Sequence, residues 1–145
     1  MRIYCESAAL RKWLRNLCIE RRIELLHFPY DRDSHTNKAT TAAIPSEAQI
    51  RDLNLPISEL PGTLVDYCGS EHLHEIVGIL GSQNRRDALH VDTALKNRCS
   101  AFVTCDNGIL AQKARLETAI GIRFFHPDTD QDELEQFVAM GCGAD

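Results

Sequence analysis

Short apolar runs alternate with segments of helical periodicity along this chain. Runs with the length and the β-branched or aromatic character of buried strands occupy residues 2–5, 23–28, 101–104 and 122–125. Apolar residues spaced three and four positions apart, as in helices, recur at 10–18, 70–80, 87–96, 108–116 and 130–140. Because strands that alternate with helices pair in parallel through helical crossovers, the pattern predicts a mostly parallel sheet with helices on both faces.

The length of 145 residues matches one ordinary domain. A chain of this size buries well over half of its unfolded surface without help from disulfides or metals. The sequence therefore predicts a single α/β domain over residues 1–145, with three α/β/α layers and a mostly parallel central sheet. We also expect a loop at 29–41, a short helix that starts at Ser46, and Ser7 as a cap of the first long helix.

The composition of the chain indicates which cellular compartment and which kinds of partner to expect. No apolar run approaches the roughly 18 residues that span a bilayer, and the first residues lack the pattern of a secretory signal. The six cysteines form no C-x-x-C pair, which favours reduced thiols in a cytoplasmic protein over a zinc site. A net charge of -5 argues against a protein that coats nucleic acid by bulk electrostatics. We expect a cytoplasmic protein with no membrane partner.

Asp87 opens the helical segment 87–96 at the edge of its apolar arc, near Val91 and Ala94. Burying an unpaired carboxylate costs several kcal/mol, so this side chain must cap the helix, be paired, be protonated or bind a cation. Two interpretations stay open. Asp87 is either an N-cap neutralised by the neighbouring arginines or part of a functional site.

Asp106 follows the strand at 101–104, and Glu6 occupies the equivalent place after the first strand. Ligand sites of open α/β sheets gather at the carboxyl ends of the strands. Asp106 is equally suited to cap the helix that starts near Gly108. If the site interpretation holds, Glu6, Asp87 and Asp106 converge from distant parts of the chain.

Several carboxylates in one pocket raise one another's pKa unless a divalent cation lies between them. Mg²⁺ or Mn²⁺ suits ligation by oxygen alone and leaves positions open for water. Such an ion can activate a bound water and stabilise the charge that grows on a phosphate. These acids therefore point to metal-dependent hydrolysis of phosphodiester bonds.

Three segments, DALHVDTA at 87–94, AFVTCD at 101–106 and GIRF at 121–124, together with Pro127, resemble the C-terminal half of a PIN domain. That family shows an acid that opens a helix, a small residue near its end, a strand that finishes in Thr-x-Asp, and a last strand that leads to proline. The resemblance covers roughly residues 85–127. It implies a PIN-like fold, toxin-type cleavage of RNA with Asp87 and Asp106 as Mg²⁺ or Mn²⁺ ligands, and an antitoxin protein as a partner.

The N-terminal half departs from the PIN pattern, which has a strand followed by Asp, by Ser or Thr, and by Asn. In this chain Glu6, Ser7 and Ala8 stand there. Glu6 is one methylene longer than Asp but is still expected to bind the metal, with Ser7 as a supporting residue. Glu47 has the spacing of the family's second acid, so it is either a further catalytic acid or a plain surface glutamate.

Further polar residues lie near the expected site. His90 is one helical turn from Asp87 and either contacts a phosphate or an acid, or is a structural histidine. Asp92 lies about 140° from Asp87 on a helical wheel, which makes it a supporting residue at the rim rather than a direct ligand. Thr104 can support the site through its hydroxyl. After the second strand, the side chains at 31 and 33, both Asp, can approach the same rim.

Two classes of function follow. The first is a Mg²⁺- or Mn²⁺-dependent endoribonuclease in which Glu6, Asp87 and Asp106 hold the ion. The alternative is a catalytically degenerate PIN-like domain that acts as an RNA-binding or protein-interaction module, because Glu6 and Ala8 replace the usual residues. A homodimer formed through an apolar face is compatible with either class.

Overall fold

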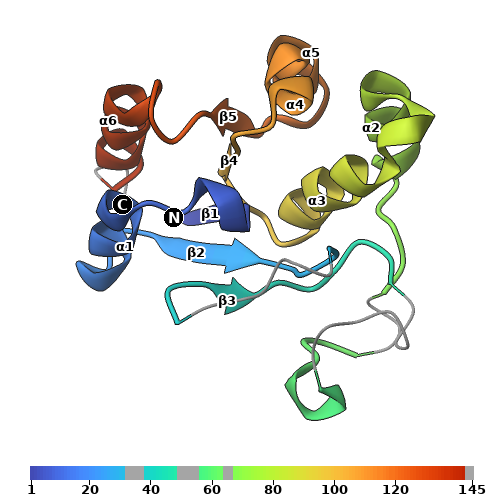
Figure 1. Cartoon of the computed structure of the whole chain (residues 1–145), viewed down its shortest axis with the longest axis horizontal. Coiled ribbons are helices and arrows are strands. Elements are labelled where there is room, and N and C mark those ends of the chain that lie inside the picture. The colour runs from blue at the N-terminus through green and yellow to red at the C-terminus, as the bar shows by residue number, and fades with distance from the viewer. Residues whose placement is uncertain (32–37, 49–55, 64–66, 143–145) are drawn as a thin grey trace.

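The central sheet has five strands, all parallel, in the order β3-β2-β1-β4-β5 (Figure 1). The computed structural model describes residues 1–31, 38–48, 56–63 and 67–142. The strands are β1 (Arg2–Cys5), β2 (Glu24–His27), β3 (Thr41–Ala42), β4 (Ala101–Val103) and β5 (Arg123–Phe125). The predicted parallel α/β sheet is therefore confirmed. The two-residue β3, which begins at the last residue of the predicted loop, was not expected.

Helices connect the strands and cover both faces of the sheet. They are α1 (Lys12–Ile19), α2 (Leu73–Leu80), α3 (Arg85–Lys96), α4 (Asn107–Ala111), α5 (Lys113–Ile120) and α6 (Gln131–Cys142), with 3₁₀ turns η1 (Ser7–Ala9), η3 (Ile57–Glu59) and η5 (Ser82–Asn84). The helix predicted at 108–116 is instead two helices. They divide at Gln112, whose N–H bonds to the Ile109 carbonyl while its own carbonyl accepts the first bond of α5.

Two other local predictions were wrong. Ser7 does not cap α1, because it lies in η1 and Arg11 occupies the N-cap position. Residues 46–48 are not helical, since Ser46 is held by side chains of α3, and the rest of that predicted helix lies outside the described residues.

The alternation of side chains along each strand builds a core on both faces. In β1, Tyr4 packs with α2, α3 and α5, whereas Ile3 and Cys5 pack with α1 and α6. Figure 1 shows the two groups of helices on opposite sides of the sheet. The predicted three-layer α/β/α arrangement is thus confirmed.

The strand order reverses between β1 and β4. The chain moves outward from β1 to β2 and β3, then returns to place β4 against the other edge of β1, with Cys5 opposite Val103. In open parallel sheets the ligand crevice lies outside the carboxyl ends of the strands at this reversal. The residues that follow Cys5 and Val103 therefore occupy the position where a site is expected.

Two further features bear on the sequence analysis. None of the helices in the described ranges is long and apolar enough to cross a membrane. The six cysteines are all free thiols, with Cys5 and Cys99 buried.

Candidate functional site

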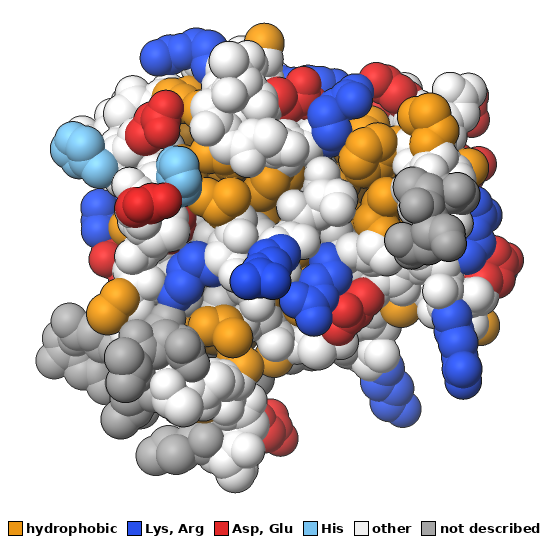
Figure 2. Space-filling model, turned by 180° about the vertical axis from the view of Figure 1, so that it is seen from behind, with side chains coloured by type: hydrophobic (Ala, Val, Ile, Leu, Met, Phe, Trp, Pro, Cys, Tyr) orange, Lys and Arg blue, Asp and Glu red, His pale blue; other side chains and the backbone are white. Residues whose placement is uncertain are grey.

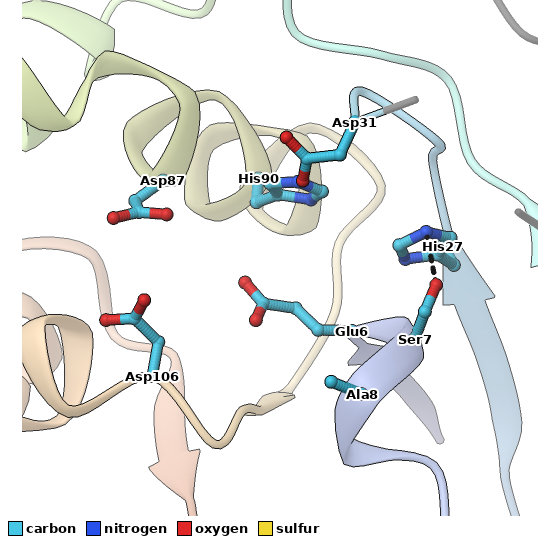
Figure 3. A pocket seen from close by; sticks show the side chains of 8 residues that line it. All are labelled: Glu6, Ser7, Ala8, His27, Asp31, Asp87, His90 and Asp106. Carbon is cyan, nitrogen blue, oxygen red and sulfur yellow. Dashed lines mark hydrogen bonds and ion pairs between the residues drawn. The ribbon is translucent and has the colours of Figure 1, made fainter. Parts of the chain in front are cut away.

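A pocket of about 490 Å³ brings acids from four separate segments together (Figure 3). Its acids are Glu6 after β1, Asp31 after β2, Asp87 on α3 and Asp106 at the start of α4. The other lining residues are Ser7, Ala8, His27 and His90. The three acids expected to converge thus line one pocket.

Thr104 connects the two acids that follow neighbouring strands. Its buried hydroxyl donates to Glu6 Oε2 at 2.8 Å and accepts the Asp106 N–H at 2.9 Å. The Glu6 N–H in turn donates to the Val103 carbonyl at 3.2 Å, which extends the pairing of β1 and β4 by one residue. Thr104 therefore has the supporting position that the sequence suggested.

Asp106 lines the pocket and caps a helix at the same time. Its Oδ1 accepts the Ile109 N–H at 3.0 Å, as an N-cap of α4 does. A Cβ at Gly108 would lie 3.0 Å from the same oxygen, so a glycine leaves space around the carboxylate. Asp106 can therefore cap α4 and also belong to the site, because the capping bond uses Oδ1 and not Oδ2.

Asp87 is not the cap of its helix. The N-cap position of α3 belongs to Asn84, and Asp87 lies in the first helical turn with its carboxylate directed into the pocket (Figure 3). A negative charge in a first turn is favourable because the helix dipole is positive there. The helix thus presents this acid to the pocket without using it as a cap.

Burial and crowding disfavour the ionised forms of two pocket acids. Burial raises the pKa of Glu6 above its ordinary value, and the charges of Asp87 and Asp106 raise it further, against the opposing effects of His90 and Thr104. Burial and the charge of Asp106 likewise raise the pKa of Asp87. A cation in the pocket would relieve this repulsion.

Asp31 differs from Glu6 and Asp87, because its surroundings favour the ionised form of its carboxyl group. His90 Nε2 lies 3.5 Å from its carboxylate and Arg86 Nη1 lies 2.9 Å away. These two partners, His90 first, lower the pKa of Asp31 to about 2. Asp31 is therefore a firmly ionised member of the pocket, while position 33 lies outside the described residues.

Two buried histidines form the wall behind the acids. His90 is 3% exposed, and its Nδ1 lies 2.6 Å from the Tyr4 hydroxyl. His27, at the end of β2, stacks on His90 and shares a 3.1 Å hydrogen bond with Ser7 Oγ. Sequence analysis did not select His27, although the rule that identified Glu6, a polar residue at a strand's carboxyl end, applies to it equally.

Glu47 does not belong to this pocket, which corrects the assignment of a second catalytic acid to it. Its carboxylate forms an ion pair with Arg85, and it lines a separate hollow beside Ser70 and His74. The loop that carries Glu47 is fixed to α3 through its neighbour Ser46. The fourth acid is instead Asp31.

Asp92 is also not at the rim, which corrects the supporting role expected for it. It is fully buried and accepts hydrogen bonds from the hydroxyls of Ser46 and Ser70 and, at 3.0 Å, from the Ser70 N–H. Its rotation of about 140° from Asp87 directs it to another side of α3. Asp92 therefore holds two loops and does not contact the pocket acids.

The pocket acids offer the right donor chemistry for Mg²⁺ or Mn²⁺, but they do not form a closed ligand set. Among the described residues, no group of three or more His, Cys, Asp or Glu side chains is close enough together to hold an ion. Mg²⁺ is usually held by one or two carboxylates and keeps several waters, so such a site does not require three carboxylates in direct contact with the ion. The oxygen donors of Glu6, Asp87 and Asp106 thus fit such an ion chemically.

Comparisons of the chain with models of known families, with curated proteins and with solved structures find no match. The resemblance to a PIN domain accordingly rests on the motifs at 87–94, 101–106 and 121–127.

Proposed function

We propose that the chain is a Mg²⁺- or Mn²⁺-dependent endoribonuclease that hydrolyses RNA at the pocket formed by Glu6, Asp87 and Asp106. The observation that carries this proposal is the convergence of these three acids, from distant segments, outside the carboxyl ends of β1 and β4. Ligands of open α/β sheets bind at this position. The raised pKa values of Glu6 and Asp87 add support, because crowded acids favour a cationic occupant.

Within this proposal the residues have separate tasks. Glu6, Asp87 and Asp106 would hold the ion, and Thr104 keeps Glu6 and Asp106 in register across the two strands. When bound, the ion would lower the pKa of a water molecule and would provide positive charge that stabilises the phosphate. Asp31, fixed by Arg86 and His90, keeps a permanent negative charge at the edge of the pocket.

The electrostatics of the pocket also favour a cation-dependent reaction. Four carboxylates line the pocket, so a phosphodiester would be repelled from it unless positive charge is added. RNA as the substrate, and an antitoxin as the partner, rest on the resemblance of the motifs at 87–94 and 101–106. A reducing, cytoplasmic location is part of the same proposal and agrees with six free thiols.

A cleavage assay tests the proposal. Purified protein is incubated with end-labelled single-stranded RNA in Mg²⁺, in Mn²⁺ or in a chelator. We expect metal-dependent cuts, with the rate reduced by roughly 100-fold or more in Asp87→Asn and Asp106→Asn. Glu47→Gln is the matched control and should cut at nearly the wild-type rate. The proposal fails if neither metal supports cleavage, or if Asp106→Asn cuts as fast as the wild type.

A second candidate function is a degenerate domain that binds RNA or a protein without cleaving. Two observations favour it. Among the described residues, no three acids are close enough together to hold an ion, and Glu6 stands where the family has Asp. Calorimetric titration with Mn²⁺ separates the candidates. Tight binding that is lost in Asp87→Asn argues for the nuclease, whereas RNA binding without any Mn²⁺ binding supports the degenerate domain.

A further inference from the structure

A pocket lined by four acids needs positive charge at its edge before it can hold a phosphate of RNA. The chain as a whole does not supply this charge. Its net charge is -5, and Lys and Arg side chains lie among Asp and Glu side chains on the face drawn in Figure 2. Among the described residues, two arginines are bonded to residues of the pocket. Arg11 donates to the Ala8 carbonyl and Arg86 donates to the Asp31 carboxylate, each at 2.9 Å.

The two arginines differ in what their guanidinium groups have left to bind. Nε and Nη2 of Arg11 donate to the two carboxylate oxygens of Asp128, so each of its nitrogens already has a partner. Within the described chain, Arg86 uses Nη1 alone, which donates to Asp31 and to the Tyr30 carbonyl at 3.0 Å. The Arg86 side chain is 58% exposed. Its Nε and Nη2 can therefore bind an anion, and a guanidinium suits the geometry of a phosphate.

A buried relay, made of Tyr4, His90 and Asp31, lies behind Arg86. The Tyr4 hydroxyl accepts the Phe28 N–H at 3.2 Å and lies 2.6 Å from His90 Nδ1. Its proton can go to this nitrogen or to the Phe28 carbonyl at 3.5 Å, and the shorter distance favours the nitrogen. An accepting Nδ1 leaves the proton of the neutral ring on Nε2, which lies 3.5 Å from Asp31. Figure 3 shows His90 and Asp31 together on the wall of the pocket.

We propose that Arg86 binds a phosphate of the RNA at the edge of the acid pocket, and that Tyr4 and His90 are positioning residues that act through Asp31. The Tyr4 hydroxyl fixes the ring of His90, and the ring faces Asp31 Oδ2. The other oxygen, Oδ1, holds Arg86. The inference rests on the proposed function, and it names the residue that offsets the repulsion between RNA and the acids.

Fluorescence anisotropy with a labelled single-stranded RNA, titrated in a chelator, tests Arg86. Every protein carries Asp106→Asn, which removes one repelling carboxylate and keeps the RNA intact. We expect Arg86→Ala to weaken binding about tenfold and to reduce the slope of log K against log salt by about 0.7, because one phosphate contact is lost. Arg86→Lys keeps the charge without the planar group and should lie between the two. Arg85→Ala removes the same charge from a side chain paired with Glu47, so it is the matched control.

Nitrogen-15 NMR of the metal-free protein tests the relay. We expect the ring of His90, assigned by the loss of its signals in His90→Gln, to carry its proton on Nε2 at neutral pH. Tyr4→Phe removes the donor to Nδ1, so both tautomers should appear and RNA binding should weaken about threefold. Tyr67→Phe removes a hydroxyl that bonds to the Pro61 carbonyl outside the pocket and should change neither reading. His90→Gln keeps a donor for Asp31 and should bind RNA more tightly than His90→Leu.

The possible outcomes separate this proposal from the proposed cleavage. The phosphate contact is overturned if the parent protein binds no RNA, or if Arg86→Ala binds it as tightly as Arg85→Ala. The relay is overturned if His90 carries its proton on Nδ1 in the wild type, or if Tyr4→Phe changes neither the tautomer nor RNA binding. A protein that binds RNA through Arg86 but cuts none in either metal would refute the nuclease and leave the phosphate contact standing.

Discussion

At the scale of single residues, the pocket depends on an uncharged side chain as much as on its acids. Thr104 is fully buried between Glu6 and Asp106 and forms hydrogen bonds to both. Its β-branched side chain suits the end of a strand, and its hydroxyl satisfies a backbone N–H that would otherwise lack a partner there. Thr104 is therefore the residue that couples the two strand ends.

Thr104→Val tests this coupling, because valine keeps the shape and removes the hydroxyl. The Asp106 N–H then loses its acceptor and Glu6 loses its donor, so the free energy of unfolding should fall by about 1–3 kcal/mol. Urea denaturation measures the change. Thr104→Ser keeps the hydroxyl and should lose less. Equal stability of the valine variant and the wild type would contradict the coupling.

The raised pKa of Glu6 predicts a pH-dependent stability in the absence of divalent ions. The folded protein holds the proton of the Glu6 carboxyl more tightly than the unfolded chain does. The stabilisation that this protonated carboxyl gives to the fold is therefore fully present below the ordinary glutamate pKa of about 4.3. It is lost as the pH rises through the folded-state pKa. Above that pH the ionised Glu6 destabilises the fold through burial and the charges of Asp87 and Asp106.

Glu6→Gln should therefore be more stable than the wild type at pH 7 in a chelator, and equally stable near pH 4. Thermal melting at the two pH values measures the difference. Glu47→Gln, outside the pocket, should show no gain at pH 7. A Glu6→Gln variant that melts no higher than the wild type at pH 7 would show that Glu6 is not strained in this way.

At the scale of elements, α3 performs two tasks on two of its sides. Its first turns present Asp87 and His90 to the pocket. Farther along, Asp92 holds the serines of two loops, and Lys96 Nζ donates to the carbonyls of Pro45 at 2.8 Å and Cys68 at 2.7 Å. The helix is thus both a wall of the pocket and the anchor for loops that carry no pocket residue.

Asp92→Ala should be strongly destabilising, because three donors from Ser46 and Ser70 lose their buried acceptor. A loss of roughly 3 kcal/mol in the free energy of unfolding is expected from urea denaturation. Asp92→Asn keeps part of the acceptor capacity and should lose less. The variant that remains folded should still bind Mn²⁺ like the wild type, and a selective loss of Mn²⁺ binding would place Asp92 in the site after all.

At the scale of the whole molecule, an ion that binds the folded pocket stabilises the entire domain. Binding to the native state alone adds about 2.7 kcal/mol when the free ion is at 100 times its Kd. For a chain of this size that corresponds to a rise in Tm of roughly 5–10 °C. We expect this rise with Mn²⁺ in the wild type and in Glu47→Gln, and a much smaller one in Asp106→Asn. An equal rise in all three proteins would show that the ion binds elsewhere.

The sequence by itself determined the elements that depend on local pattern. The strand Arg2–Cys5 and the helix around Asp87 were predicted from the spacing of apolar residues, and Glu6 and Asp106 from their places after strands. The order of neighbouring residues is sufficient to predict these elements and acids, because periodicity and strand ends are properties of short stretches of sequence. The two-residue β3 shows the limit, since Thr41 and Ala42 are too few to display a period and are defined by their pairing with β2.

Only the tertiary structure decided which distant side chains meet. Glu47 has the sequence spacing of a second acid, yet its loop is fixed to another side of α3, and Asp31 takes the place in the pocket instead. His27 and His90 are brought together because β2 lies beside β1 and α3 packs on that face of the sheet. The path of the chain through space, which is set by the packing of whole elements, determines the members of the site, and no spacing along the sequence encodes it directly.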